Sequence, residues 1–148
     1  MMTHVHVERL EHYSDDDAAQ LGRILPFLSA NLQDKPIPQE ILEKIIYSES
    51  RAQIVARIEG RIVGAATMNL TVSIATGEKG MLDDFVTDPE VRKLGIGDKI
   101  WEEMERWCRE QGVNLDFTSH PSREAAHRFY LNHGAVIRET TVFHKEVE

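Results

Sequence analysis

A long helical pattern headed by two closely spaced glycines is the feature that most limits how this chain can fold. Apolar side chains recur at helical spacing over residues 96–111, which predicts an amphipathic helix about 24 Å long that ends at Gly112. Gly95 and Gly97 stand at its start, shortly after a strand-like segment that ends at Pro89. The pattern therefore predicts a strand, a glycine turn and a helix in close succession.

The glycine turn has the properties of a diphosphate-binding site. The first turn of a helix presents N–H groups without intrahelical acceptors and a partial positive charge, so phosphates bind there readily. Gly95 and Gly97 remove Cβ atoms where a diphosphate would approach the backbone, and Arg92 and Lys93 add positive charge. A tight connection without a ligand explains the two glycines equally well. Walker and dinucleotide-binding motifs are excluded, because neither the Gly-Lys-Ser/Thr sequence nor a third glycine at Ile100 is present.

The remaining periodicities predict a sheet flanked by helices. Alternation over residues 4–10 predicts a strand, and Ser14 begins a helical segment that Pro26 kinks or ends. A second helix follows, and then two strands joined by a hairpin at Glu59-Gly60. After the central helix the pattern predicts a strand over 113–119, a helix over 122–134 and a last strand over 135–147. The predicted order is therefore βααβββαβαβ. These elements would form one α/β (α+β) domain over residues 4–148, with a mixed, mostly antiparallel sheet.

Composition excludes several classes of function. The formal charge of −8 disfavours nucleic acid as a partner, and no apolar run is long enough to cross a membrane. The first ten residues predict no leader, and Cys108 is the only cysteine, so we expect a reducing, cytoplasmic location without a disulfide or a thiolate metal cluster. The histidines at positions 4, 6 and 12 have no suitably spaced carboxylate partner, so we expect no metal.

Two motifs considered together resemble a known family. The segment Leu82-Asp83-Asp84-Phe85-Val86-Thr87-Asp88-Pro89 leads into Arg92-x-x-Gly95-x-Gly97, and Ala126-x-x-Phe129-Tyr130-x-x-x-Gly134 follows about 30 residues later. The pair, in this element order, resembles the GNAT superfamily of acyl-CoA-dependent N-acyltransferases. The sequence "AHRFYLNHG" is most similar to bacterial small-amine acetyltransferases of the aminoalkylphosphonate kind.

The resemblance implies acetyl-CoA as the cosubstrate and assigns residues to it. The backbone amides from Lys93 to Asp98 would bind the CoA diphosphate, and Arg92 adds charge beside it. The residues assigned to this part of the cosubstrate are Arg92, Lys93, Leu94, Gly95, Ile96, Gly97 and Asp98. The strand that carries Phe85, Val86 and Thr87 would separate from the strand over 113–119 and pair with the pantetheine arm. A backbone N–H near Val86 would polarise the thioester carbonyl.

The resemblance also implies two catalytic residues. Tyr130 would protonate the departing CoA thiolate, and Asp83 would remove the proton of the attacking ammonium, directly or through a water. Asp84 is the alternative base, because neighbouring strand residues face opposite sides unless a bulge intervenes. A packed, hydrogen-bonded interior tyrosine is the alternative for Tyr130.

The chain departs from the family pattern at two positions. Arg123 stands where the family often has Asn, so a contact to the pantetheine arm is missing or is replaced by Ser122. Asp98 would repel a diphosphate unless its side chain turns outward.

The resemblance leads to two hypotheses about function. The first is acetyl transfer to a primary amine of a small molecule or a peptide N-terminus in a ternary complex, by a chain that could form a homodimer. The second is a non-catalytic acyl-CoA-binding regulatory module. The acceptor would meet the early helices and the loop over 29–40, where Asp34, Glu40 and Glu43 would suit a cation.

Overall fold

The computed structural model describes residues 4–148; the first three residues, part of the segment in which the sequence predicts no leader, lie outside it. Contacts divide the chain into two compact units, one that ends at Phe117 and one that begins at Thr118.

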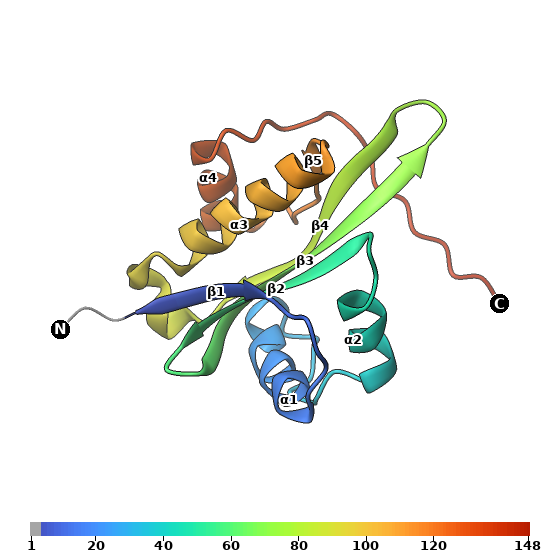
Figure 1. Ribbon diagram of the computed structural model, residues 1–148. Helices are drawn as coiled ribbons and strands as arrows, with labels where there is room; N and C mark the ends of the chain where they lie inside the picture. The colour runs from blue at the N-terminus through green and yellow to red at the C-terminus, as the bar shows by residue number, and fades with distance from the viewer. Residues whose placement is uncertain (1–3) are drawn as a thin grey trace. The chain divides into compact units, whose positions relative to one another are not determined.

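The first unit is built on a five-stranded mixed sheet (Figure 1). Its strands are β1 (Val5–Arg9), β2 (Arg51–Ile58), β3 (Arg61–Ser73), β4 (Gly77–Thr87) and β5 (Leu115–Asp116), in that spatial order. The first three pairings are antiparallel, and β4 pairs with β5 in parallel. The predicted mixed, mostly antiparallel sheet is therefore confirmed, although β5 is shorter than the strand predicted over 113–119.

Helices cover both faces of this sheet. The helix α1 (Asp15–Ile24), the 3-10 turn η1 (Leu25–Phe27) and α2 (Gln39–Ile46) follow β1, and the 3-10 turn η2 (Pro89–Leu94) leads from β4 into α3 (Ile96–Gln111). Figure 1 shows α1 and α2 on one side of the sheet and α3 on the other. The central helix has the predicted bounds.

Local sequence chemistry explains where these elements begin and turn. The Ser14 hydroxyl accepts a hydrogen bond from the Asp17 amide at 3.0 Å, which satisfies one of the unpaired N–H groups at the start of α1. Pro26 lies in η1, so the helical path continues past Ile24 only as a tighter turn. Glu59 and Gly60, with φ of 50° and 81°, form the predicted hairpin turn.

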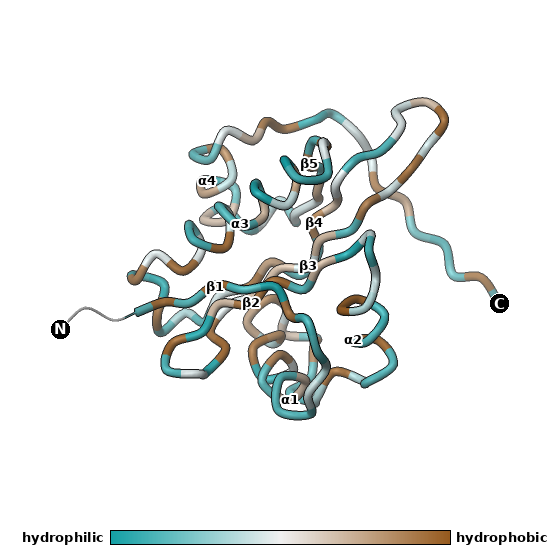
Figure 2. Tube along the Cα trace, in the orientation of Figure 1, coloured by the Kyte–Doolittle hydropathy of each residue, from teal (hydrophilic) through white to brown (hydrophobic). Residues whose placement is uncertain are grey.

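The core has one layer on each side of the sheet. On the α1–α2 side a single cluster contains buried residues of β2, β3 and β4 together with both helices: Leu10, Ala18, Leu21, Ile24, Leu42, Val55, Ile62, Ala65 and Val86. The α3 side contributes Ile96, Ile100 and Met104, each fully buried. In Figure 2 hydrophobic segments gather where α1 and α2 meet the strands. Trp101 and Trp107, with exposed fractions of 4% and 2%, are core residues and not a surface for binding.

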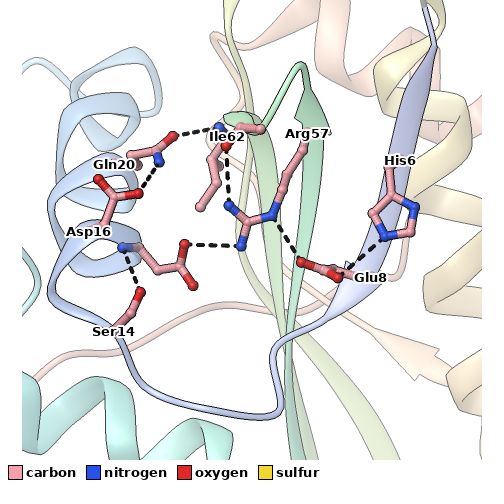
Figure 3. A network of polar contacts seen from close by, with 9 residues as sticks. His6, Glu8, Ser14, Asp16, Gln20, Arg57 and Ile62 are labelled. Carbon is pink, nitrogen blue, oxygen red and sulfur yellow. Dashed lines mark hydrogen bonds and ion pairs between the residues drawn. The ribbon is translucent and has the colours of Figure 1, made fainter.

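A network of hydrogen bonds and ion pairs connects α1 to the sheet (Figure 3). Arg57 of β2 donates to Glu8 and to the buried Asp17, both at 2.9 Å. Gln20 accepts from the Ile62 amide at 2.6 Å. The guanidinium of Arg57 lowers the pKa of Glu8, although partial burial opposes this. The side of α1 nearest the sheet is therefore held by charge as well as by apolar packing.

The second unit contains α4 (Glu124–Asn132), which the sequence predicts, but not the last strand. Residues 135–148 form no helix or strand, so the strand predicted over 135–147 is wrong for this structure. Val136, Ile137 and Phe143 are 80%, 79% and 88% exposed. Alternation of apolar and polar residues predicts which side chains of a strand would share a face. A strand also needs a neighbouring strand for its backbone hydrogen bonds, and the alternation does not show whether one is present.

Candidate active site

The strands β4 and β5 part from one another early. They pair only at Gly80 with Leu115 and at Met81 with Asp116. β4 continues to Thr87, and β5 ends at Asp116. β5 therefore does not run alongside residues 82–87 of β4, the stretch in which the resemblance leads us to expect the strands to separate.

Three aromatic rings gather around the point where the strands part. The rings of Phe85 in β4 and Trp101 in α3 have centroids 6.5 Å apart. Phe117, just past β5, meets Trp101 edge-on at 6.0 Å. Edge-to-face packing at these distances is favourable. The rings therefore connect β4, α3 and the end of β5 where the backbone ladder between the strands has stopped.

A bulge interrupts β4 at the two candidate bases. Thr67 of β3 pairs with Asp83 and Ala65 pairs with Val86, so Ala66 opposes two residues, Asp84 and Phe85. Asp84 has φ of 53°, a left-handed conformation that few residues other than Gly, Asn and Asp adopt. The alternation of side chains along a regular strand therefore does not hold between Asp83 and Asp84.

The two carboxylates differ in their surroundings. Asp83 accepts a hydrogen bond from Asn69 at 2.9 Å, and Asn69 in turn accepts from Arg51 at 3.1 Å. Asp84 reaches solvent, yet the protein atoms around its carboxyl group raise its pKa, and the charge of Asp83 raises it further. A carboxylate with a raised pKa is a stronger base, so Asp84 is chemically better suited to accept a proton from an ammonium group.

In the glycine turn only Gly95 has a backbone conformation that favours glycine. Gly95 has φ of 74° and is the N-cap of α3, whereas Gly97 lies within the helix. The Lys99 amide donates to the Gly95 carbonyl at 3.1 Å, so the amides of Ile96 and Gly97 precede the first hydrogen bond of the helix. Arg92 and Lys93 are exposed beside the turn. The predicted elements of an anion site are therefore adjacent, and Ile96 anchors them because its side chain is fully buried.

Two further residues support the glycine turn, and the site predicted from the sequence does not include them. Gly64 of β3 lies against α3, where an added Cβ would come within 2.7 Å of Ile100 Cδ1 and 3.0 Å of Ile96 Cγ2. A glycine inside a strand pattern signals such a close approach. Asp88, just after β4, is only 2% exposed and accepts from the Glu90 amide at 3.0 Å. Its signal in the sequence is an N-cap residue followed by proline.

Tyr130 belongs to the second unit, where it lies on α4 and is 8% exposed. Burial raises its pKa, and Arg123 opposes this rise. The hydroxyl group therefore stays protonated at neutral pH, as a proton donor must. Ser122, the alternative contact to the pantetheine arm, is hydrogen-bonded to His120 Nδ1 at 2.7 Å.

Comparison with known proteins assigns the chain to a family. Residues 19–135 match the sequence profile of the Acetyltransferase (GNAT) family. The chain belongs to this family. The match spans both quoted motifs and ends where the segment without a helix or strand begins. The protein is thus an acetyl-CoA-dependent acetyltransferase by family, and the family resemblance identified from the two motifs is confirmed.

Solved structures share the fold. An aminoglycoside acetyltransferase from an uncultured soil metagenomic sample, in complex with trehalose, is 22% identical with a TM-score of 0.82, and the match covers 97% of each chain. The aminoglycoside N-acetyltransferase AAC(6')-Iy in complex with CoA is 14% identical with a TM-score of 0.82, over 99% of this chain and 97% of that one. A transcriptional regulator from Bacillus halodurans C-125 is 21% identical with a TM-score of 0.83, over 96% and 100%. The GNAT architecture therefore extends over nearly the whole chain.

One curated protein is similar in sequence. The PanD regulatory factor of Salmonella typhimurium (strain LT2) is 28% identical over 113 residues, which cover 71% of this chain and 76% of that protein. Its name describes a regulator, which is the class of the second hypothesis.

The described residues also bear on membranes and metals. Among residues 4–148, no helix combines the length and apolar character that a membrane crossing needs. The same residues hold no group of three or more His, Cys, Asp or Glu side chains arranged to bind a metal ion.

Proposed function

We propose that this protein transfers the acetyl group of acetyl-CoA to a primary amine of a small molecule or a peptide N-terminus, by direct attack in a ternary complex. The observation that carries the proposal is the early parting of β4 from β5 beside a glycine-headed helix, in a chain of the GNAT family. The names of two solved relatives, both aminoglycoside acetyltransferases, support a small-molecule amine as the acceptor class.

The residues around the turn fit the CoA diphosphate. Arg92 and Lys93 supply positive charge, and the amides of Ile96 and Gly97 lie at the positive end of the α3 dipole. Asp98 is exposed, and its Oδ2 would lie 4.0 Å from a Cβ at Gly95. We expect that carboxylate to stay on the solvent side of the bound diphosphate. Arg92 through Asp98 remain the proposed diphosphate-binding segment.

The part of β4 that runs on past its pairing with β5 fits the pantetheine arm. Main-chain groups of Phe85, Val86 and Thr87 would pair with the amides of the arm, as a neighbouring strand would. A backbone N–H near Val86 would then polarise the thioester carbonyl. Such a donor contributes about 3 to 4 kcal/mol to stabilisation of the developing oxyanion.

The acceptor nitrogen must lose two protons in all, and the CoA thiolate must gain one. The acceptor ammonium gives its first proton to a carboxylate, the neutral amine forms the new C–N bond as the C–S bond breaks, and the nitrogen then gives up its second proton, which restores the hydroxyl of the acid that protonates the thiolate. The sequence favours Asp83 as the base. We now propose Asp84, with Asp83 beside it, because the raised pKa of Asp84 makes it the better acceptor. Tyr130, protonated at neutral pH, would supply the proton that the CoA thiolate takes up.

A thiol-release assay with acetyl-CoA tests the proposal. The acceptor panel should include aminoglycosides, aminoalkylphosphonates, polyamines, amino acids and short peptides, since the aminoalkylphosphonate subtype rests on "AHRFYLNHG" and the pattern of the strand and helix before it. We expect one acceptor class to give turnover well above acetyl-CoA hydrolysis. Light scattering on the same sample checks the proposed homodimer.

The regulatory alternative has its own support in the similarity to the PanD regulatory factor. A regulatory module would bind CoA or acetyl-CoA tightly and release no thiol with any amine, and its partner would be another protein. Calorimetry on the sample used in the assay separates the two functions. Tight binding without turnover would replace the enzyme proposal with the regulatory one.

A further inference from the structure

We propose that Asp88 is a positioning residue for the diphosphate turn. This inference rests on the proposed function, because it concerns how that turn is held ready for CoA. Asp88 stands between the end of β4 and the start of η2, and it is only 2% exposed. Buried carboxylates are uncommon unless their acceptor capacity is used, so its partners show what it does.

Backbone contacts fix Asp88 at the end of the sheet. Its amide donates to the Val63 carbonyl of β3 at 2.8 Å. Its own carbonyl accepts from the Val91 amide at 3.2 Å, which closes the first turn of η2. Asp88 therefore lies where the sheet ends and the turn begins.

The side chain of Asp88 orders that turn. Oδ1 accepts from the Glu90 amide at 3.0 Å as an N-cap, and Pro89 occupies the next position, where its fixed φ suits a helix start. Oδ2 lies 3.5 Å from Nη2 of Arg61, whose side chain is 55% exposed. An ion pair with so exposed a partner contributes little, so the cap to Glu90 is the main interaction.

The cap matters for the ligand because η2 leads directly to Gly95. The turn runs from Pro89 to Leu94, and the Gly95 amide donates to the Arg92 carbonyl at 3.4 Å. Movement at the start of η2 would move Arg92 and the amides that follow Gly95. Without the cap, part of the population would hold the turn in other conformations, and the apparent dissociation constant of CoA would rise in inverse proportion to the fraction that remains competent to bind.

The inference predicts that CoA affinity follows the quality of the cap at position 88. Asp88→Asn keeps an oxygen for the Glu90 amide and should bind CoA within about twofold of wild type. Asp88→Ala removes it and should bind on the order of fivefold more weakly, measured by calorimetry. Asp88→Thr, a weaker cap, takes the place of alanine if the alanine variant does not fold. Arg61→Gln is the matched control and should leave CoA affinity unchanged.

A substrate without the diphosphate separates positioning from general damage. S-acetylpantetheine carries the thioester and the arm but no adenosine diphosphate, so Asp88→Ala should leave its kcat/KM unchanged while raising KM for acetyl-CoA. Equal CoA affinity in the alanine variant would overturn the inference, and so would equal losses with both substrates. A wild-type protein that does not bind CoA would instead overturn the proposed function itself.

Discussion

Asn69 in β3 donates a hydrogen bond from Nδ2 to Oδ2 of Asp83 in β4, at 2.9 Å, one residue before the bulge at Asp84. Asp83 lies beside Asp84, whose pKa is raised first by burial and then by the charge of Asp83. The two neighbouring carboxyl groups therefore have different surroundings, and Asp84 is the proposed base.

Asp84→Asn should lower kcat with the best acceptor by about a hundredfold at neutral pH, because general-base catalysis contributes factors of this order. Asp83→Asn is the matched variant and should lower kcat far less, since it leaves Asp84 in place. Steady-state kinetics on both variants measure the difference. A larger loss in Asp83→Asn would return the role of base to Asp83, as the sequence favours.

The pH profile of kcat/KM should show the influence of Asp83 on Asp84. Burial first, and the charge of Asp83 second, raise the pKa of Asp84 above its ordinary value of 3.8. The base works only when deprotonated, so activity should fall as the pH is lowered through that raised pKa. Asp83→Asn removes the second cause, and the acidic limb should move to lower pH. An acidic limb that stays at the same pH, or moves to higher pH, in Asp83→Asn would contradict this coupling between the two carboxyl groups.

Tyr130→Phe should lower turnover by about a hundredfold without a change in CoA affinity, because the proton donor is lost and the ring is retained. Turnover comes from the thiol-release assay and affinity from calorimetry. Phe129→Leu in the same helix serves as a control for altered packing. If Tyr130→Phe keeps full turnover, Tyr130 is a structural residue of α4.

Gly95→Val and Gly97→Val should fail in different ways. Gly95 has φ of 74°, so valine there strains the backbone and should lower the melting temperature as well as CoA binding. Gly97 lies inside α3, so valine there should leave most of the stability and weaken CoA binding by at least about tenfold. Gly97→Val is therefore the cleaner test. Unchanged CoA affinity in this variant would argue against diphosphate binding at the turn.

Gly22→Ala should destabilise the protein, although helix propensity alone predicts a gain of about 1 kcal/mol. A Cβ at Gly22 would lie 1.8 Å from the Lys35 carbonyl oxygen, so the loop would have to move. Such overpacking costs about 1 to 3 kcal/mol. Ala19→Gly, at an exposed position of the same helix, measures the propensity term by itself. Chemical denaturation gives both values, and a stabilised Gly22→Ala would contradict the close contact.

The sequence predicts most of the first unit correctly because its signals there are local. Ser14, Gly112 and the stripe that begins at Ile96 mark helix boundaries through hydrogen bonds and packing within a few residues. The strand over 135–147 fails because a strand depends on a distant neighbour. The same limit explains the shortened β5, of which only Leu115 and Asp116 pair.

At the site, sequence locates the residues but not their geometry. The bulge at Asp84 depends on how β3 and β4 align, which no periodicity within β4 reveals. The support from Asp88 and Gly64 depends on burial and close approach, which become visible only when the strands and α3 are packed. Tyr130 is found through its motif alone.

The β-sheet of this protein is unfinished on one side, since β4 loses its parallel neighbour after Met81. If the pantetheine arm pairs with β4 in place of that neighbour, the ligand is hydrogen-bonded to the sheet itself. The free energy of unfolding then depends on the concentration of acetyl-CoA. At a ligand concentration a hundred times the dissociation constant, such linkage adds about 2.7 kcal/mol to the resistance against unfolding. In a cell with little acetyl-CoA the protein would unfold more often and proteases would cleave it measurably faster.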